Sequence, residues 1–309
     1  MNNIHKKLRK FYHAHVSPEM RRKLKFSLLI KKIKIALQLA LNLPLKKAQS
    51  KIRFVVHLAE HCNLNCAGCD HFSSIAEPEL AEFKEFERDI KRMGELFNHE
   101  CRSLHLLGGE PLLNPEIIKF MKAARENFIS GEIAVFTNGI LLASQSDEFW
   151  QACHDNNILI KISAYPIRLD INKIKLTANK FKVKLQWAGG EDEAEHDNFI
   201  IPKVDLTGRG DIRKNFAWYG RGGDCLMLKH GRLYPCTFIP NITHFNKKFN
   251  KNLEITPQDY IDIYAEHDKD IILNKLSQPV PACRYCDTLP EHETRFAWHV
   301  TKGDISEWL

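Results

Sequence analysis

Strand-like and helix-like segments alternate from residue 51 to about residue 187, and this alternation constrains the fold more than any other feature. Short runs rich in Val, Ile and Leu are separated by longer segments with apolar residues at helical spacing. The predicted strands are 52–58, 103–107, 132–136, 158–164 and 183–187, and the predicted helices are 79–98, a segment after Pro115, 147–155 and 171–181. Successive βαβ units predict an α/β fold with a parallel sheet.

No such alternation follows after about residue 200. The segment CLMLKHGRLYPC, residues 225–236, predicts a hairpin with His230 and Gly231 in its turn, and a helix is predicted near residues 257–266. The prediction therefore has three parts. They are a basic N-terminal extension of residues 1–50, a barrel domain of residues 51–205 and a small irregular domain of residues 206–309.

The N-terminal extension is strongly basic. Residues 1–50 contain 13 Lys or Arg and one acid, Glu19, so they carry +12 and leave −5 of the overall +7 for the rest. Leu29, Ile33 and Leu37 recur at helical spacing. The predicted helix packs on the domain with its basic face in water, or it lies on an anionic membrane as a peripheral contact. No nucleic-acid-binding module is recognisable, so no nucleic-acid partner is expected.

Nothing in the sequence indicates export or insertion into a membrane. No run of about 18 apolar residues is present, and the N-terminus lacks the features of a signal peptide. Nine cysteines in a chain without an export signal indicate a reducing compartment. We therefore expect a cytoplasmic protein whose cysteines are metal ligands or core residues.

Three cysteines lie within eight residues, in the segment CNLNCAGC that follows the first predicted strand. Cys62, Cys66 and Cys69 have the spacing C-x3-C-x2-C. A [4Fe–4S] cluster normally takes four thiolates, so three would leave one iron open to a ligand. A zinc site or three unrelated thiols are the alternatives. Zinc prefers paired C-x2-C motifs with four ligands, and no fourth cysteine or histidine lies at that spacing, although His61 and His71 are close by. The spacing favours an iron–sulfur cluster.

This cysteine loop, together with GGEP after the next strand, resembles the radical S-adenosylmethionine (SAM) superfamily over roughly residues 52–187. The resemblance implies a partial (β/α)6 barrel whose open iron chelates the amino and carboxylate groups of SAM. It implies that the reduced cluster cleaves SAM to methionine and a 5′-deoxyadenosyl radical, which abstracts a substrate hydrogen. It also implies an external electron donor such as flavodoxin or ferredoxin.

The resemblance also assigns SAM contacts outside the cysteine loop. Gly108, Gly109 and Glu110 match the segment that contacts the methionine amino group, with the Glu110 carboxylate as acceptor. Asn138 and Ser163 match strand-end positions that often hold the methionine carboxylate or the ribose. Without the resemblance, a plain turn or core role would explain these residues as well.

One position departs from the family pattern. Family members usually carry an aromatic residue just before the third cysteine, near the adenine of SAM, whereas this chain has Gly68 there. We expect Phe72 or His71 to supply that surface instead.

Four further cysteines form a second set. Cys225 and Cys236 flank the predicted hairpin, and Cys283 and Cys286 form C-x2-C in PVPACRYCD. Four converging thiolates hold either a complete second [4Fe–4S] cluster or structural zinc. The layout resembles the auxiliary-cluster domain called twitch, a shortened form of the SPASM domain, which some radical SAM enzymes carry.

The number of ligands in the second set suggests a mechanism. A cluster with four thiolates leaves no iron for the substrate, so it is expected to relay an electron. A relay suits a dehydrogenase-like oxidation of an alcohol, and we expect a sugar, polyol or glycan precursor from carbohydrate biosynthesis as substrate. Modification of a peptide is one alternative, and a non-catalytic electron carrier is another.

The catalytic residues stay unknown, with Asp205 as a candidate proton acceptor. Arg209, Arg213 and Arg221 are candidate anion ligands or ordinary surface charges.

Overall fold

The computed structural model describes residues 52–128, 130–163, 165–188, 198–199, 202–218, 225–287 and 296–309. Contacts divide the chain into two compact units, Met1–Leu45 and Lys46–Leu309, and the description below concerns the second unit. The basic extension predicted for residues 1–50 lies outside the described residues. Within the described part of the chain, no helix has the length and apolar character needed to cross a membrane.

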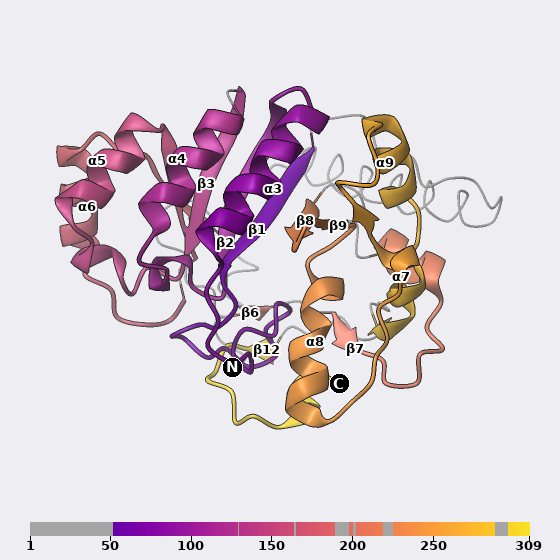
Figure 1. Cartoon of the computed structure of the whole chain (residues 1–309). Helices are drawn as coiled ribbons and strands as arrows, with labels where there is room; N and C mark the ends of the chain where they lie inside the picture. Colours follow the sequence, from indigo (N-terminus) through magenta and orange to yellow (C-terminus); the bar gives the residue numbers. More distant parts are fainter. Residues whose placement is uncertain are drawn as a thin grey trace, which may run out of the picture. The chain divides into compact units, whose positions relative to one another are not determined.

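An eight-stranded sheet organises this unit (Figure 1). Its order is β10-β9-β8-β1-β2-β3-β4-β5. Strands β8 and β1 to β5 are parallel, and β9 and β10 are antiparallel. The strands are β1 (Arg53–Ala59), β2 (Glu100–Gly108), β3 (Ser130–Thr137), β4 (Ile158–Ser163), β5 (Leu185–Ala188), β8 (Cys225–Lys229), β9 (Arg232–Tyr234) and β10 (Ile261–Asp262). The fold is therefore the predicted α/β partial barrel, with a parallel sheet.

Helices connect the parallel strands and cover one face of the sheet, as Figure 1 shows for α3 to α6. They are α3 (Phe83–Leu96), α4 (Ile117–Asn127), α5 (Asp147–Asp155) and α6 (Ile171–Lys180). In α3, Phe86, Ile90 and Met93 follow the helical period and are buried, and the Phe86 ring lies 4.8 Å from the Phe120 ring of α4. This packing forms the hydrophobic core between the helices and the sheet.

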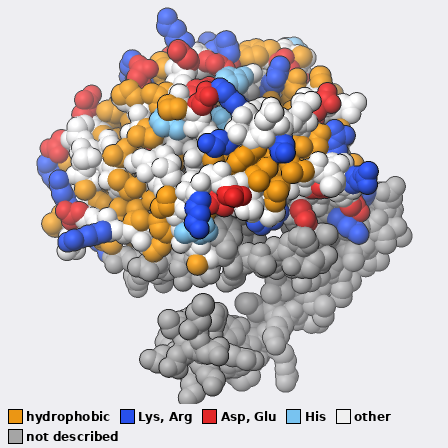
Figure 2. Space-filling view, turned by 90° about the horizontal axis from the view of Figure 1, so that it is seen from below, with side chains coloured by type: hydrophobic (Ala, Val, Ile, Leu, Met, Phe, Trp, Pro, Cys, Tyr) orange, Lys and Arg blue, Asp and Glu red, His pale blue; other side chains and the backbone are white. Residues whose placement is uncertain are grey.

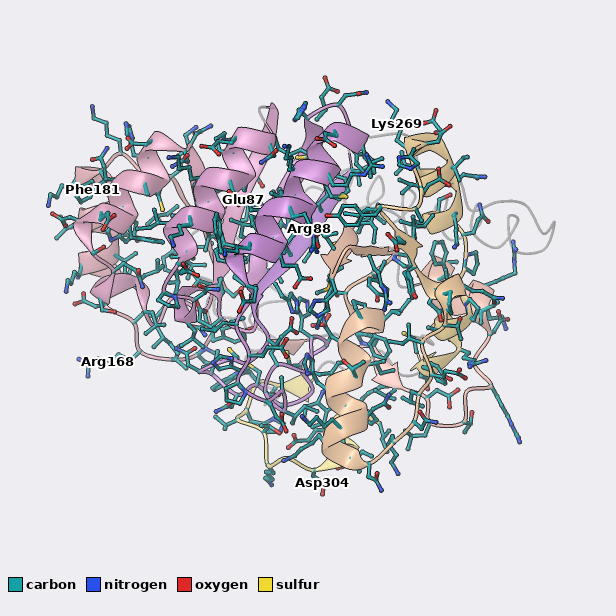
Figure 3. All side chains as sticks on the ribbon, viewed as in Figure 1. Glu87, Arg88, Arg168, Phe181, Lys269 and Asp304 are labelled. Carbon is teal, nitrogen blue, oxygen red and sulfur yellow. The ribbon has the colours of Figure 1, made fainter. Side chains whose placement is uncertain are left out.

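Side chains fill the space between the sheet and these helices, whereas Arg168 and Lys269 point outward (Figure 3). Seen from below, the surface shows hydrophobic side chains between charged side chains of both signs (Figure 2). Exposed large hydrophobic residues such as Leu80, Leu176 and Ile271 come from different elements. Such scattered apolar exposure is ordinary for a protein surface.

The C-terminal region adds short elements to the sheet. The hairpin of β8 and β9 is confirmed, with His230 and Gly231 in its turn at φ values of 51° and 68°. The helices are α7 (Ile212–Trp218), α8 (Phe238–Phe249) and α9 (Lys269–Leu276). The 3-10 helices are η1 (Pro111–Leu113), η2 (Leu142–Ser144), η3 (Pro257–Asp259), η4 (Pro281–Tyr285) and η6 (Ile305–Glu307). Two small strand pairs join β6 (Asn198–Phe199) to β12 (Phe296–Ala297) and β7 (Lys203–Val204) to β11 (Cys286–Asp287).

The helix predicted near residues 257–266 is wrong. Thr256 and Asp259 form a capping box around the single turn of η3, and Ile261 then pairs with Leu233 in the sheet. The sequence analysis also missed α8, because Pro240 and β-branched residues weaken the helical signal of its first turns.

Strand β8 belongs to the predicted C-terminal domain, yet it pairs in parallel with β1. The register runs from Arg53 opposite Cys225 to Val56 opposite Leu228. The barrel sheet therefore continues past residue 205. This pairing attaches the hairpin of the second cysteine set to the strand that leads into the first cysteine loop.

Candidate active site

The first cysteine loop follows β1 and borders a cavity of about 420 Å³. Cys62, Cys66 and Cys69 all line this cavity. Asn65 and Gly68 have positive φ values of 54° and 63°, which turn the loop back on itself between the cysteines. The loop therefore presents its three thiols to one space.

Nitrogen donors surround two of these sulfurs. The backbone N–H of Leu64 donates to Cys62 Sγ at 3.5 Å, and Asn138 Nδ2 donates to the same sulfur at 3.6 Å. Trp298 Nε1 donates to Cys66 Sγ at 3.1 Å. Such N–H···S bonds stabilise the negative charge of a metal-bound thiolate.

The thiols are not set up to ionise without a metal. Burial is the main cause that raises the pKa of Cys62 to about 11 and of Cys69 to about 12, and the nearby Cys66 raises both further. Binding of a metal centre requires the thiolate form and releases these protons. Three clustered thiols that face a cavity fit a [4Fe–4S] cluster with one open iron.

The two glycines after β2 pack against the root of the cysteine loop. A Cβ atom on Gly108 would lie 2.1 Å from the Ala59 carbonyl oxygen, and one on Gly109 would lie 2.1 Å from the His61 carbonyl oxygen. Gly109 N donates to Ala59 O at 2.8 Å. Glycine is required here because two backbones touch, and both glycines also line the cavity.

The carboxylate of Glu110 is fully buried. It accepts hydrogen bonds from Leu112 N at 3.1 Å, Thr137 Oγ1 at 2.7 Å and Asn138 N at 2.9 Å. Burial raises its pKa to about 7 despite these bonds. In this arrangement Glu110 joins the ends of β2 and β3, while Thr137 and Asn138 face the cavity.

The other predicted SAM-contact positions also border the cavity. Asn138 and Ser163 line it, together with Tyr165, which the sequence analysis did not single out. His71 lines it as well, whereas Phe72 is fully buried and packs against Phe238 and Phe245 of α8. The expectation that Phe72 supplies an aromatic surface is therefore wrong, because its ring belongs to the core.

A C-terminal segment, residues 298–308, lies across the first cysteine loop. Its backbone pairs with the loop through Ala67 N to His299 O at 3.0 Å and Thr301 N to Asn65 O at 2.8 Å. Trp308 Nε1 donates to Cys69 O at 3.0 Å. Through these bonds and that of Trp298 to Cys66, the segment holds the loop in place.

The second cysteine set converges at the start of α8 and at η4. Cys236, Cys283 and Cys286 are buried, and Cys225 lines the cavity. Burial raises the pKa of Cys236 to about 12, and the adjacent thiols of Cys283 and Cys225 raise it further. Cys286 is affected in the same way by Cys236 and Cys283. Four neighbouring thiols match the number of cysteine ligands in a [4Fe–4S] cluster or in a structural zinc site.

Asn215 of α7 holds the C-x2-C turn. Its Nδ2 donates to the carbonyl oxygens of Cys283 at 3.0 Å and Cys286 at 2.5 Å. Asp259 Oδ1 accepts from Ala282 N at 2.6 Å on the same turn. Among the described residues, no group of three or more His, Cys, Asp or Glu side chains is arranged to hold a single metal ion.

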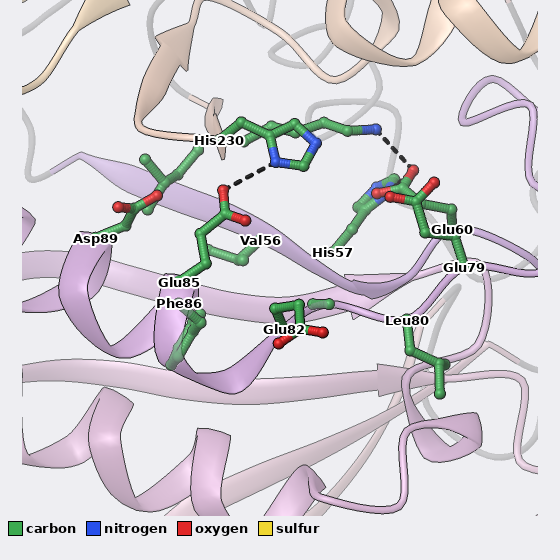
Figure 4. A pocket seen from close by; sticks show the side chains of 13 residues that line it. Val56, His57, Glu60, Glu79, Leu80, Glu82, Glu85, Phe86, Asp89 and His230 are labelled. Carbon is green, nitrogen blue, oxygen red and sulfur yellow. Dashed lines mark hydrogen bonds and ion pairs between the residues drawn. The ribbon is translucent and has the colours of Figure 1, made fainter.

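Buried polar contacts connect the two cysteine sets. Glu60, just before the first loop, accepts from Lys229 of β8 at 2.8 Å and bonds His244 of α8 at 2.8 Å and His57 at 3.3 Å. His57 Nε2 in turn lies 2.9 Å from His71 Nδ1. Several of these groups border a separate hollow of about 100 Å³ between β1, α3 and the hairpin (Figure 4).

The candidate acceptor Asp205 does not line the cavity. Its Oδ1 accepts from Thr207 N at 2.7 Å in the loop after β7. Arg209 lies in the same loop and Arg213 lies on α7, and Arg221 is outside the described residues. The cavity instead contains Arg53 and His105, which sequence analysis missed although both occupy inward positions of predicted strands.

Comparison with known proteins agrees with this geometry. Residues 56–192 match the sequence model of the Radical SAM superfamily. Residues 56–192 are therefore of radical SAM superfamily type, and that superfamily implies a [4Fe–4S] cluster and SAM. A GTP 3′,8-cyclase of Staphylococcus epidermidis is 25% identical over 181 residues, 52% of each chain. One of Clostridium perfringens is 32% identical over 96 residues, 30% of this chain and 29% of the relative. The chain spans about half the length, or less, of these curated relatives.

Similar solved structures include BtrN in complex with AdoMet and 2-DOIA. It is 14% identical, covers 79% of this chain and 95% of its own, and has a TM-score of 0.49. Native anSMEcpe with bound AdoMet is 13% identical, covers 76% and 82%, and has a TM-score of 0.44.

Proposed function

We propose that this chain is a radical SAM enzyme that oxidises an alcohol of a sugar, polyol or glycan precursor. The observation that carries the proposal is that the first cysteine loop and Cys225 of the second set line one cavity. A substrate in this cavity would lie between the two cysteine sets. Such a position suits a reaction that removes a hydrogen atom on one side and an electron on the other.

When bound, the two clusters and SAM would supply a hydrogen-abstracting radical and an acceptor for one electron. The chain's own residues hold the thiols, orient SAM and restrict water. Asn138, Ser163 and the backbone of Gly108 and Gly109 border the space beside the first loop and would orient SAM there. Cys225 also lines this cavity.

The curated relatives support a small-molecule substrate. The curated relatives act, by their name, on GTP, which is a phosphorylated small molecule. Modification of a peptide remains the alternative within the superfamily. A non-catalytic electron carrier would not require an open iron next to the SAM-facing positions.

Two measurements test the proposal. The anaerobically reduced protein should cleave SAM to 5′-deoxyadenosine, and a substrate deuterated at the reacting carbon should transfer deuterium into that product. If SAM is cleaved and deuterium is transferred from a peptide but from no sugar or polyol, the substrate class is a peptide and not the proposed one. Absence of SAM cleavage in protein that holds its iron would reject the enzyme itself.

We also propose that the basic extension binds anionic membranes at the periphery. The +12 charge of residues 1–50 supports this proposal, because each well-placed Lys or Arg contributes roughly 1 kcal/mol at an anionic surface. Full-length protein should sediment with anionic vesicles at low salt and less at high salt. Protein lacking residues 1–50 should stay in the supernatant, and failure of the full-length protein to sediment would reject the proposal.

A further inference from the structure

The cavity wall contributed by the sheet carries polar groups that the cysteine sites do not use. Arg53 of β1 and His105 of β2 both line the cavity. Side chains alternate along a strand, so Arg53 and Val55 face the cavity, while Phe54 packs in the core. Val55 is the register partner of His105, which places Arg53 and His105 on the same face of adjacent strands.

Both residues have buried polar atoms without partners. Within the described part of the chain, Arg53 Nε and His105 Nε2 form no hydrogen bond. His105 is only 5% exposed. Glu132 Oε1 lies 3.9 Å from His105 Nε2, which is too long for a hydrogen bond, and it accepts from Lys161 Nζ at 2.5 Å. Buried atoms of this kind cost free energy unless a ligand satisfies them.

The electrostatic character of this wall is positive. Burial, followed by the charges of Arg53, Lys161 and Arg102, lowers the pKa of His105 to about 3. His105 is therefore neutral near pH 7 and Arg53 supplies the charge, because Glu132 already pairs with Lys161. On the side of the cysteine loop, Asp70 and His71 also face the cavity. The anion-compatible part of the cavity is thus the wall of β1 and β2.

We propose that Arg53 and His105 bind an anionic group of the substrate, a phosphate or a diphosphate. This inference rests on the proposed function, because it assigns the substrate class of the same cavity. A guanidinium with an adjacent imidazole N–H matches the oxygens of a phosphate. Ser73 and Ser74, whose Oγ atoms are buried and unpartnered within the described residues, line the cavity too and offer hydroxyls to the remainder of the molecule.

The length of β1 sets the size of the ligand. The strand runs seven residues from Arg53 to Ala59, which is about 20 Å at the usual rise of a strand. The first cysteine loop begins just beyond Ala59. A substrate that reaches from Arg53 towards this loop must therefore be extended, as a nucleotide-linked sugar is.

Arg53 also lies beside the second cysteine set, since Cys225 is its register partner on β8. A guanidinium at this place could instead balance the charge of a cluster bound by that set. The two roles differ in a measurable way. A counter-charge would change the reduction potential of the second cluster without changing the affinity for an anion.

The test is a calorimetric titration of the reconstituted full-length protein with inorganic pyrophosphate, at about 150 mM salt to screen surface charges. Arg53→Gln should weaken the apparent affinity about tenfold or more, as expected for loss of a charged hydrogen bond. Arg102→Gln is the matched control, because Arg102 is an exposed residue of β2 that does not line the cavity. It removes the same charge and should change the affinity less than about twofold.

Binding of pyrophosphate to the basic extension is common to all variants and cancels in the comparison. Arg53→Lys keeps the charge but loses the paired N–H donors of the guanidinium, so it should bind pyrophosphate with intermediate affinity. This variant serves as the test if Arg53→Gln does not fold. Equal affinity in wild type and Arg53→Gln would overturn the inference. An unchanged affinity with a shifted potential of the second cluster would overturn it as well. Protein that shows Arg53-dependent pyrophosphate binding but never cleaves SAM would reject the proposed function and keep the subsite.

Discussion

The two cysteine sets are built in opposite ways. Cys62, Cys66 and Cys69 come from one short loop, are partly exposed and line a cavity. In the second set, Cys283 and Cys286 are sealed in the interior beside thiols from a distant hairpin. A local, open set leaves room for an exchangeable ligand, whereas the second set is assembled by the tertiary fold, which buries three of its four thiols.

Different contacts hold the two sets. Side-chain donors reach the sulfurs of the first loop directly, through Asn138 and Trp298. In the second set, Asn215 binds the carbonyl oxygens of Cys283 and Cys286 and leaves the sulfurs to the core. Substitutions around the first set should therefore alter the reduction potential of a cluster bound there. Substitutions around the second set should alter how fast a cluster bound there loses its metal.

The largest expected effect separates the chemical roles of the two sets. Cys66→Ala should reduce SAM cleavage to background, because the open-iron cluster loses one of three ligands. Cys283→Ala should keep uncoupled SAM cleavage and lose the oxidised product. Chromatographic assay of 5′-deoxyadenosine and product checks both variants. Full product formation by Cys283→Ala would show that the second set is no electron relay.

Metal analysis tests whether both sets hold iron. Reconstituted wild type should contain about eight irons and eight sulfides per chain, and the Cys225→Ala, Cys236→Ala double variant should contain about four of each. The reason is that the double variant loses half of the second set and leaves the first loop intact. Zinc in place of half of the iron in wild type would identify the second site as structural zinc.

Loss of the amide that holds the second set should reduce stability. Asn215→Ala leaves two buried carbonyl oxygens without this donor, so the free energy of unfolding should fall by about 2 kcal/mol. Iron should also leave the second set faster in the presence of a chelator. Asn127→Ala is a control, since Asn127 Nδ2 bonds a carbonyl oxygen of its own helix α4, that of Ala123. Equal iron release in both variants would contradict the role given to Asn215.

Lowering the pH should reduce the stability of the fold through His105, which lines the cavity beside the first cysteine loop. An unfolded histidine has a pKa near 6.5, whereas burial lowers that of His105 to about 3. The unfolded state therefore binds the proton first, and the stability present above pH 6.5 is lost as the pH falls towards 3. Between pH 6.5 and 5 this amounts to about 2 kcal/mol. Denaturant unfolding of His105→Gln should show a free energy of unfolding that falls less between pH 6.5 and 5 than in wild type. An identical pH dependence in the two proteins would disprove the assignment.

The smallest expected effect concerns the N–H···S bond to Cys66. Trp298→Phe removes a donor worth about 1 kcal/mol to the more negative reduced state, so the potential of the first cluster should fall by about 40 mV. Trp308→Phe is the matched control, because Trp308 donates to a carbonyl and not to a sulfur. Spectroscopic redox titration measures both variants. Equal shifts would mean that the C-terminal segment acts by packing alone.

The sequence predicted the parts of the molecule that depend on local pattern. The strands of the parallel sheet, the hairpin and the grouping of Cys62, Cys66 and Cys69 at a strand end follow from short-range periodicity and spacing. The pairing of β8 with β1 joins segments far apart in the chain, and no local signal records it. The contact between Trp298 and Cys66 is equally remote, and the sequence analysis gave Trp298 no role.

Side-chain direction was the other limit. The motif identified Glu110, yet its carboxylate turns into the protein because Thr137 and two backbone N–H groups satisfy it there. Phe72 follows the cysteine loop but enters the core beside α8. Arg53 and His105 carried a usable signal, since polar residues at inward positions of buried strands are costly without a ligand.

The contact between the C-terminal segment and the first loop has a consequence for biosynthesis. Trp298 and Cys66 are separated by 232 residues, and Trp308 and Cys69 by 239. A ribosome makes the loop long before it makes its cover, so the three thiols stay accessible throughout translation of the barrel. Machinery that delivers iron and sulfide can then reach the loop from the side on which Trp298 and Trp308 later bind it. Cluster insertion into the finished chain should be slower than insertion into a chain still lacking residues 298–308.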